Sequence, residues 1–374
     1  MKSIYRTIAV VFLVLVLLLV LILRLRYGGG KAYPDLSTTP ILPKEALETV
    51  YSFPEPLGNL SVSQTGRIFF TVHPESRPTG PSVLEIRNGQ AVPYPNAEQQ
   101  ATLYKTVLSL RVDRFNRLWI LDHGQHGFEG ARLLGFDLAN DSLIHEHQFS
   151  KAIAPCGSFF NDFQVDPDGS TIYIADVNFF GKRPALIVYD VDTQTARRLL
   201  ERHSSTSPQD WIIETPQKRM TFLGGLVALK PGIDGITLDA AGEWLYYGAM
   251  THDGLFKVRT TDLKDTGLGQ RELAERVLRV GTKPLSDGLS IDSLGQIYLT
   301  DVEHSGLALM QPDGTLQTLI RDEARIRWAD GCSFGPDGYL YFTDSAIPDQ
   351  MLRSKKHMQS KAPYYIYRIK APHG

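Results

Sequence analysis

Residues Ile236–Ala249 read ITLDAAGEWLYYGA, and this stretch decides the fold because five other segments share its pattern. Each copy has a short apolar strand, a turn, and a second apolar strand. Four copies close the first strand with Asp, and five have Gly three residues later, which is typical of a tight hairpin in which Gly takes a positive φ. The other copies are LSVSQTGRIFFTV (Leu60–Val72), LRVDRFNRLWILD (Leu110–Asp122), FQVDPDGSTIYIAD (Phe163–Asp176), LSIDSLGQIYLTD (Leu289–Asp301) and CSFGPDGYLYFTD (Cys332–Asp344).

The copies begin 50, 53, 73, 53 and 43 residues apart, and further strand-like runs lie between them. Four strands per repeat at this spacing predict the blade of a propeller. One blade cannot bury both of its faces, but six blades in a ring can. We therefore predict an all-β fold, a six-bladed β-propeller over residues 46–371 with an N-terminal transmembrane helix. The last copy lacks an outer strand, which Ala46–Phe53 is expected to supply.

Composition excludes several classes of function. The net charge of the 374 residues is −2, which argues against a nucleic-acid partner. The two cysteines form no CxxC motif, so a thiolate zinc site is not expected, and they fall in non-adjacent repeats, which disfavours a disulfide. The absence of P-loop, GxSxG and HExxH motifs argues against nucleotide-dependent and serine-hydrolase mechanisms.

The N-terminal segment Thr7–Leu23 is apolar apart from its threonine. As a helix it would span roughly 26 Å, close to the hydrocarbon thickness of a bilayer. Arg24 and Arg26 follow, without the small residues of a cleavage site, which favours an uncleaved signal anchor over a signal peptide. We expect residues 1–31 to form the anchor and its flanks and residues 32–45 a tether. The propeller would then lie outside the cytoplasm, periplasmic or extracellular, or be secreted if the segment is cleaved.

A register argument locates candidate residues at the mouth of the central channel. The positions five residues before the turn hold Asn161, Asp234, Asp287 and Asp330 in the last four copies, and Gly58 and Leu108 in the first two. Crowded carboxylates repel one another unless a cation is present, and oxygen ligands suit calcium, magnesium or manganese and also accept zinc. We predict one divalent cation on Asp234 and Asp287. The alternative is that each Asp-Gly pair only forms a turn.

The loop after the second strand of each copy should reach the same mouth. Because His titrates near neutral pH, we predict that histidines in these loops act with Asp330 in catalysis. The Asp that ends the second strand in four copies is expected to bond the loop backbone. The predicted catalytic histidines are His126, His252 and His304, and the predicted ligand-binding residues are Asn161, Asn178 and Glu303, with Trp211 or Trp328 packing on the ligand.

Two stretches exceed the repeat, Glu201–Ile233 and Ile347–Pro363. Long insertions in a rigid ring are often lids or binding loops, although surface decoration is the alternative.

Three stretches of the chain resemble the major royal jelly protein/yellow family, in the manner of a bacterial-type member. They are DRFNRLWILDHG (Asp113–Gly124), DGSTIYIADV with the ALIVYDV that follows (Asp168–Val191), and DGITLDAAGEWLYYGAMTHDGLFKVRTTDL (Asp234–Leu263). The resemblance runs from about Leu47 to Ile369 and implies a fold similar to regucalcin/gluconolactonase-like propellers. In gluconolactonase-like enzymes a Glu, an Asn and an Asp hold a divalent cation. Asp234 and Asp287 match that Asn and Asp, whereas Gly58 stands in place of the Glu.

The sequence leaves enzymatic activity open. The first hypothesis is a metal-assisted, lactonase-like hydrolase, or an isomerase such as a dopachrome-type tautomerase, acting on a small cyclic oxygen-rich molecule at the channel. The alternative is a non-enzymatic small-ligand-binding propeller of the royal jelly/yellow type, and a third is a protein-interaction platform. The expected partners are a small molecule and the membrane.

Overall fold

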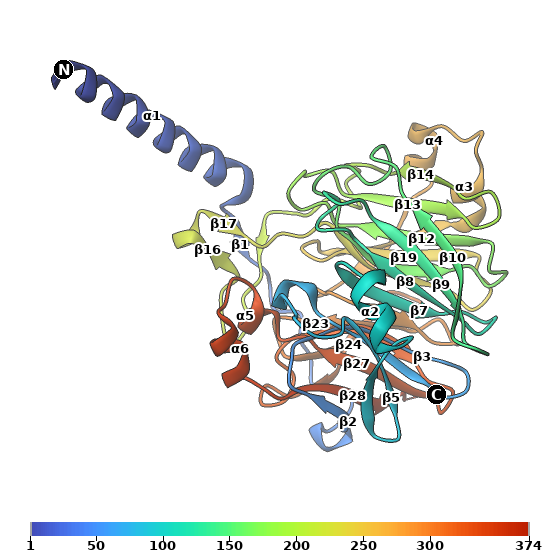
Figure 1. Ribbon diagram of the computed structural model, residues 1–374. Coiled ribbons are helices and arrows are strands. Elements are labelled where there is room, and N and C mark those ends of the chain that lie inside the picture. The colour runs from blue at the N-terminus through green and yellow to red at the C-terminus, as the bar shows by residue number, and fades with distance from the viewer. Residues whose placement is uncertain (1, 373–374) are drawn as a thin grey trace.

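The computed structural model describes residues 2–372, and most of them form the predicted six-bladed β-propeller (Figure 1). Each blade is a four-stranded sheet whose neighbouring strands run antiparallel. From the channel outward the blades are β3 (Leu57–Val62), β4 (Ile68–Val72), β5 (Val83–Arg87), β6 (Gln90–Pro93); β7 (Val107–Val112), β8 (Arg117–Asp122), β9 (Arg132–Asp137), β10 (Ser142–Gln148); β11 (Phe160–Val165), β12 (Thr171–Asp176), β13 (Ala185–Asp190), β14 (Thr195–Leu199); β18 (Ile233–Leu238), β19 (Trp244–Ala249), β20 (Gly254–Arg259), β21 (Leu278–Thr282); β22 (Leu289–Ile291), β23 (Ile297–Asp301), β24 (Gly306–Met310), β25 (Leu316–Arg321); and β26 (Ala329–Phe334), β27 (Tyr339–Asp344), β28 (Tyr364–Lys370), β2 (Glu48–Phe53).

The turn between the first two strands of each blade has the predicted chemistry. A residue with positive φ occupies the same position in the turns, and it is glycine in five of the six copies because glycine pays no steric penalty there. The second copy has Asn116 instead, with φ 59°. The five glycines are Gly66, Gly169, Gly242, Gly295 and Gly338.

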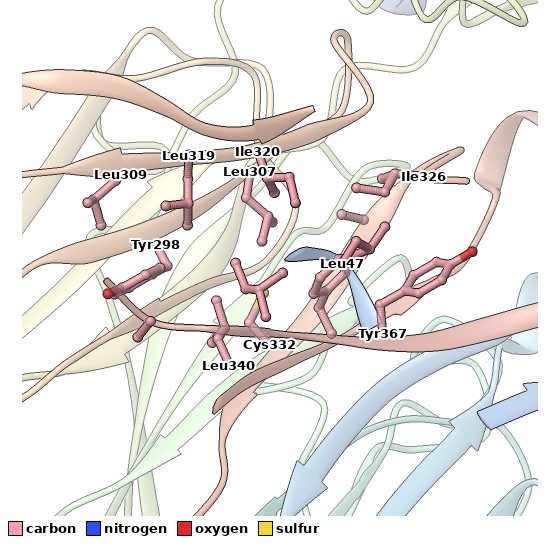
Figure 2. Packing of buried hydrophobic residues seen from close by; sticks show 14 residues of the cluster. Leu47, Tyr298, Leu307, Leu309, Leu319, Ile320, Ile326, Cys332, Leu340 and Tyr367 are labelled. Carbon is pink, nitrogen blue, oxygen red and sulfur yellow. The ribbon is translucent and has the colours of Figure 1, made fainter. Parts of the chain in front are cut away.

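The ring closes as the sequence predicts, because β2 from the N-terminal part of the chain pairs antiparallel with β28. The closure is reinforced by Arg368, whose Nε donates to Glu48 at 2.8 Å. Figure 2 shows the apolar packing beside this closure, where Leu47, which precedes β2, is buried with Cys332 and Tyr367. The N-terminal strand is therefore held by backbone pairing and by the core together.

The Asp residues that end the second strands have the structural role expected of them. Asp122 accepts from the backbone N–H groups of Lys105 and Thr106, and Asp344 accepts from those of Arg327 and Trp328. These bonds hold the loops that enter the innermost strands of the second and sixth blades. Both cysteines are free, Cys156 on the surface and Cys332 in the core.

Short helices occur in several connections between strands. Asn96 caps α2 by accepting from the backbone N–H of Gln99 at 2.9 Å. These helices are α2 (Ala97–Leu103), α3 (Thr260–Lys264) and α4 (Gln270–Glu275).

The two insertions carry small elements of their own. The first contains β15 (Trp211–Ile212), β16 (Thr221–Phe222), the 3-10 turn η3 (Leu223–Gly225) and β17 (Val227–Ala228); the second contains α5 (Ile347–Gln350) and α6 (Lys355–Ser360). Two further 3-10 turns are η1 (Lys44–Ala46) and η2 (Pro74–Ser76). Both insertions lie on the side of the ring from which the N-terminal helix leaves (Figure 1).

The N-terminal helix α1 (Lys2–Tyr27) projects from the propeller (Figure 1). Its stretch Ile4–Tyr27 is long and apolar enough to cross a membrane, and none of its most apolar window is buried. After the helix, β1 (Lys31–Ala32) pairs in parallel with β15, and the Ile41 backbone N–H donates to the Thr318 carbonyl at 3.0 Å. The segment predicted to be a tether therefore lies along the propeller.

Candidate functional site

The end of the central channel opens into a cavity of about 300 Å³. Its floor contains the four polar residues that the register argument selected, which are Asn161, Asp234, Asp287 and Asp330. Its walls are mostly apolar and come from the blade loops and from both insertions, including Phe159, Phe179, Phe222, Leu229, Ile347 and Met351. Both insertions thus build the site, which the sequence left undecided.

The floor residues point into the cavity because the innermost strands are distorted at one register. Five of the six innermost strands shift register against their neighbours at this level, and the bulge spans Leu108, Asn161, Asp234 and Asp330 in four of them. A bulge bends its strand and re-aims a side chain. In the fifth blade β22 begins only after Asp287. The same local irregularity therefore brings polar side chains from successive blades to one point.

Glycine follows each floor Asp because neighbouring strands come very close there. A Cβ on Gly235 would lie 2.5 Å from the Asp287 carbonyl oxygen, and one on Gly288 would lie 2.5 Å from that of Asp330. These separations are shorter than any normal contact with a side-chain carbon. Glycine at these positions therefore permits the close approach of neighbouring strands beside the channel.

The floor carboxyls are held by hydrogen bonds and bear raised pKa values. The Asn161 amide donates to Asp234, and Trp328 Nε1 donates to Asp287 Oδ2 at 2.6 Å. Burial, followed by the charge of Asp287, raises the pKa values of Asp234 and Asp330 well above the usual range. Burial also raises the pKa of Asp287 to about 7, although the bond from Trp328 opposes the rise. Without a cation to balance their charges, the floor carboxyls therefore keep their protons to higher pH than ordinary carboxyls do.

A further carboxyl, Asp162, lies beneath this floor. It accepts from Asn59 Nδ2 at 2.6 Å and from Ser109 Oγ at 3.2 Å, which tie three blades together at the channel. Burial raises the pKa of Asp162 to about 6. The carboxamide oxygen of Asn59 is buried without a hydrogen-bond partner. Asp162 follows Asn161 within the same bulge but does not line the cavity, and the register argument, which selects one position per repeat, passed over it.

One predicted histidine lies on the cavity wall. His126 Nε2 is 2.9 Å from Glu75 Oε1, and its ring stacks on Phe159. Glu75 and His73 also line the cavity and were missed by the sequence argument. They follow the second strand of the first copy, in the loop position that holds His126 in the second copy. Reading that loop in the first copy as well would have found them.

The other predicted residues lie outside this cavity lining. His252 is buried with its Nδ1 accepting from the Gly254 N–H, and His304 is bound by Asp301 through Nδ1 at 3.0 Å. Glu303 accepts from the Glu214 backbone N–H, and Asn178 is buried beside Ser158. These side chains hold loops in place. Of the two tryptophans, Trp328 lines the cavity, whereas Trp211 packs on Tyr33.

The floor fits a divalent cation in donor chemistry. It offers only oxygen ligands, and a cation would relieve the repulsion that raises the carboxyl pKa values. Within residues 2–372, no three His, Cys, Asp or Glu side chains form a ready-made metal-binding group. The first-blade position is Gly58, which brings no side-chain ligand. The fit therefore rests on the donor set and not on a closed coordination shell.

Solved structures with the same fold cover nearly the whole chain. A gluconolactonase from Xanthomonas campestris matches with a TM-score of 0.56 and 14% identity over 92% of this chain and 98% of its own. A luciferin-regenerating enzyme matches with a TM-score of 0.57 and 11% identity over 87% and 95%. The calcium-binding protein regucalcin from Agrobacterium tumefaciens matches with a TM-score of 0.53 and 13% identity over 86% and 93%. At these identities the likeness shows the fold alone.

Curated relatives are insect proteins. Major royal jelly protein 9 of Apis mellifera is 28% identical over 214 residues, 52% of this chain and 48% of the relative. The yellow-related salivary protein SP03 of Phlebotomus perniciosus is 28% identical over 220 residues, 51% of this chain and 53% of the relative. The chain spans about half the length of the curated relatives it matches. The model of the family described as "Major royal jelly protein" matches residues 105–363, most of the propeller, and the chain therefore belongs to the major royal jelly protein family.

Proposed function

We propose that this protein is a membrane-anchored hydrolase that opens a cyclic ester carrying an apolar substituent. The observation that carries the proposal is the pairing, in one cavity, of apolar walls with a floor of buried carboxyls whose pKa values are raised. The walls would hold the substituent, and the floor would face the ester group. The shared fold with a gluconolactonase supports lactone chemistry, and the apolar walls favour a less oxygen-rich substrate than the sequence suggested.

Proton transfer would fall to Asp330 and His126. With its Nε2–H donated to Glu75, His126 keeps Nδ1 as the basic nitrogen and takes a proton from the attacking water. The water oxygen bonds to the ester carbonyl carbon, and the ring C–O bond breaks. Burial raises the pKa of Asp330 well above its usual range, which suits it to give a proton to the leaving alkoxide. The product is a hydroxy acid, and the proton returns to Asp330 from His126 or solvent.

Asp234, Asp287 and Asn161 would face the ester carbonyl on the floor. A divalent cation bound by these three residues would polarise that carbonyl. Trp328 would keep the Asp287 carboxylate turned toward the cavity through its hydrogen bond. His252, His304, Asn178 and Glu303 remain predictions without a part in this scheme.

The test is lactone hydrolysis by the full-length chain in detergent micelles, with calcium, magnesium, manganese or zinc. We expect turnover of γ-dodecalactone to exceed that of γ-butyrolactone, because only the former has an apolar chain for the walls. Asp234→Asn and Asp330→Asn should each lose on the order of 100-fold in kcat. The exposed turn variant Asp192→Asn is the matched control. Absence of turnover for both lactones with every metal would exclude the hydrolase.

A second candidate is a binding protein for a cationic amphiphile. The same apolar walls over an acidic floor favour it, because an ammonium group would neutralise the carboxylates that repel one another. Calorimetry with dodecylammonium in metal-free buffer distinguishes the two. Binding that Asp234→Asn weakens, without any lactone turnover, would identify a binding protein.

A further inference from the structure

The end of helix α1 is fastened to the loops that form the cavity mouth. Arg24 Nη1 donates to the Gly225 carbonyl at 2.7 Å, in the first insertion. The Tyr27 hydroxyl donates to the Phe180 carbonyl at 2.7 Å, in the β12–β13 loop. Lys230 Nζ then donates to the Gly28 carbonyl at 2.9 Å. Gly28 has no room for a side chain, since a Cβ would lie 2.8 Å from the Leu226 carbonyl. The helix therefore leaves the mouth from a fixed point, without a flexible spacer.

The lip of the cavity is apolar and exposed. Phe180, Leu223 and Leu352 all line the cavity, yet 52%, 65% and 69% of their surfaces are exposed. Leu223 and Leu352 also have positive φ angles of 51° and 56°, where Asn and Gly are the usual residues. Two loops from different parts of the chain thus present leucine to the outside at positions that disfavour it. Exposed apolar side chains gathered at one opening indicate a surface that contacts an apolar phase.

The length of α1 determines where this lip lies relative to a bilayer. The apolar stretch from Thr7 to Leu23 would span about 26 Å as a helix, which is close to the thickness of the hydrocarbon core of a bilayer. Arg24 then lies at the headgroup level, and so does the loop it binds. Leu223 is two residues from Gly225, and Phe180 supplies the carbonyl that Tyr27 contacts. The lip is therefore placed at the membrane surface on the side where the propeller lies.

The positively charged side chains around the end of α1 also suit contact with a membrane surface. Arg26 Nη2 donates to the Gly181 carbonyl at 3.1 Å, and Lys182 lies over the Tyr27 ring with its Nζ 4.9 Å from the ring centre. With Arg24 they form a basic cluster beside the mouth, next to Lys230, whose Nζ is paired with Asp210 Oδ1 at 2.8 Å. Basic residues next to a membrane helix attract anionic headgroups.

We propose that the cavity opens onto the bilayer and takes its ligand from the lipid phase, so that the ligand is a membrane-dissolved amphiphile. This proposal rests on the proposed function in one respect, that the cavity is a small-molecule site. The apolar tail would remain against the lip and the walls while the polar head reaches Asp234 and Asp330. The bilayer itself is the partner of the lip, and a water-soluble sugar lactone would be a poor ligand.

The first test locates the lip relative to the bilayer without using any ligand. Full-length protein with Cys156→Ser is reconstituted in phosphatidylcholine vesicles containing a spin-labelled lipid. Single cysteines at Leu223 and Leu352 carry an environment-sensitive fluorophore. The matched controls are cysteines at Phe115 and Leu294, which are 57% and 59% exposed in hairpin turns at the other end of the blades. We expect the loss of most fluorescence at the lip and little loss at the controls. Equal quenching at all four positions would overturn the proposal.

The second test measures delivery. Leu223→Asn with Leu352→Asn suits the positive φ at both positions, so the fold should be kept. We expect uptake of γ-dodecalactone from vesicles to fall roughly tenfold for each leucine, from the burial lost by each side chain. Binding of the same probe from detergent solution should fall less than uptake from vesicles, because no contact of the lip with a bilayer is lost there, and Phe115→Ser should alter neither. An equal fall in both would contradict the membrane-facing mouth. Binding from detergent without quenching at the lip would refute the membrane-facing mouth. Quenching at the lip without binding of the lactone would refute the proposed function and leave the orientation standing.

Discussion

Replacing Asp287 by Asn should stabilise this protein at alkaline pH. The carboxyl is buried in the channel floor, with a pKa of about 7 in the folded protein against an ordinary value of 3.8. The difference of about 3 units corresponds to a free energy on the order of 4 kcal/mol, at 1.36 kcal/mol per unit. The folded state binds this proton more tightly than the unfolded state. The stabilisation is therefore complete below pH 3.8 and is lost as the pH rises through about 7.

The Asp287→Asn variant avoids this loss because an amide does not ionise. The carbonyl oxygen of the introduced amide can still accept a hydrogen bond from Trp328 Nε1, which lies 2.6 Å from Asp287 Oδ2 in the wild-type protein. Removal of the Asp287 charge also lowers the pKa values of Asp234 and Asp330, which adds to the gain. We expect the variant to exceed the wild type by on the order of 4 kcal/mol at pH 8 and to match it near pH 4.

The assay is denaturant unfolding of the full chain in detergent micelles with a chelator, at several pH values from 4 to 8. Asp192→Asn, in an exposed turn, serves as the control and should not change stability at any pH. A variant that is less stable than the wild type at pH 8, or whose advantage does not shrink toward pH 4, would refute the electrostatic account of the floor.

Three further predictions concern the same floor. Trp328→Phe removes the donor to Asp287 and should raise its pKa by about 1–2 units, which carbon-detected NMR titration of the carboxyl would measure. Gly288→Ala places a Cβ 2.5 Å from the Asp330 carbonyl and should cost about 1–3 kcal/mol by thermal unfolding, whereas Gly80→Ala, whose nearest neighbour is 3.9 Å away, should cost little. Calcium binding at pH 7 should release protons, because the floor carboxyls must ionise to bind it; uptake of calcium without proton release in two buffers of different ionisation enthalpy would contradict this.

The sequence predicted the ring and the register of the floor because both depend on local chemistry. A turn glycine such as Gly242 and alternating strands report the hairpin directly, and six hairpins leave few arrangements other than a ring. The position of Asp234 follows from counting back from that turn. The ring closure by β2 was predictable because the last repeat visibly lacked a strand.

The cavity walls and the histidine roles depend on long-range packing, which no local pattern reports. Phe222 and Met351 come from insertions without repeat symmetry, so nothing in the sequence placed them over the channel. His304 was expected at the mouth, but its ring is held by Asp301, three residues before it. The same loop register holds His126 against the cavity, because Glu75 comes from the neighbouring blade to meet it.

The closure of the ring by β2 and β28 also sets the order in which the chain can be finished. Glu48 pairs with a residue 320 positions later, so the last blade cannot exist until the C-terminal strand has been synthesised. Until then the residues of β2 have no partner strand and are open to proteases and to pairing with other chains. The final strand therefore completes the ring only at the end of synthesis, and a chain that stops before Tyr364 would leave β2 exposed without a partner.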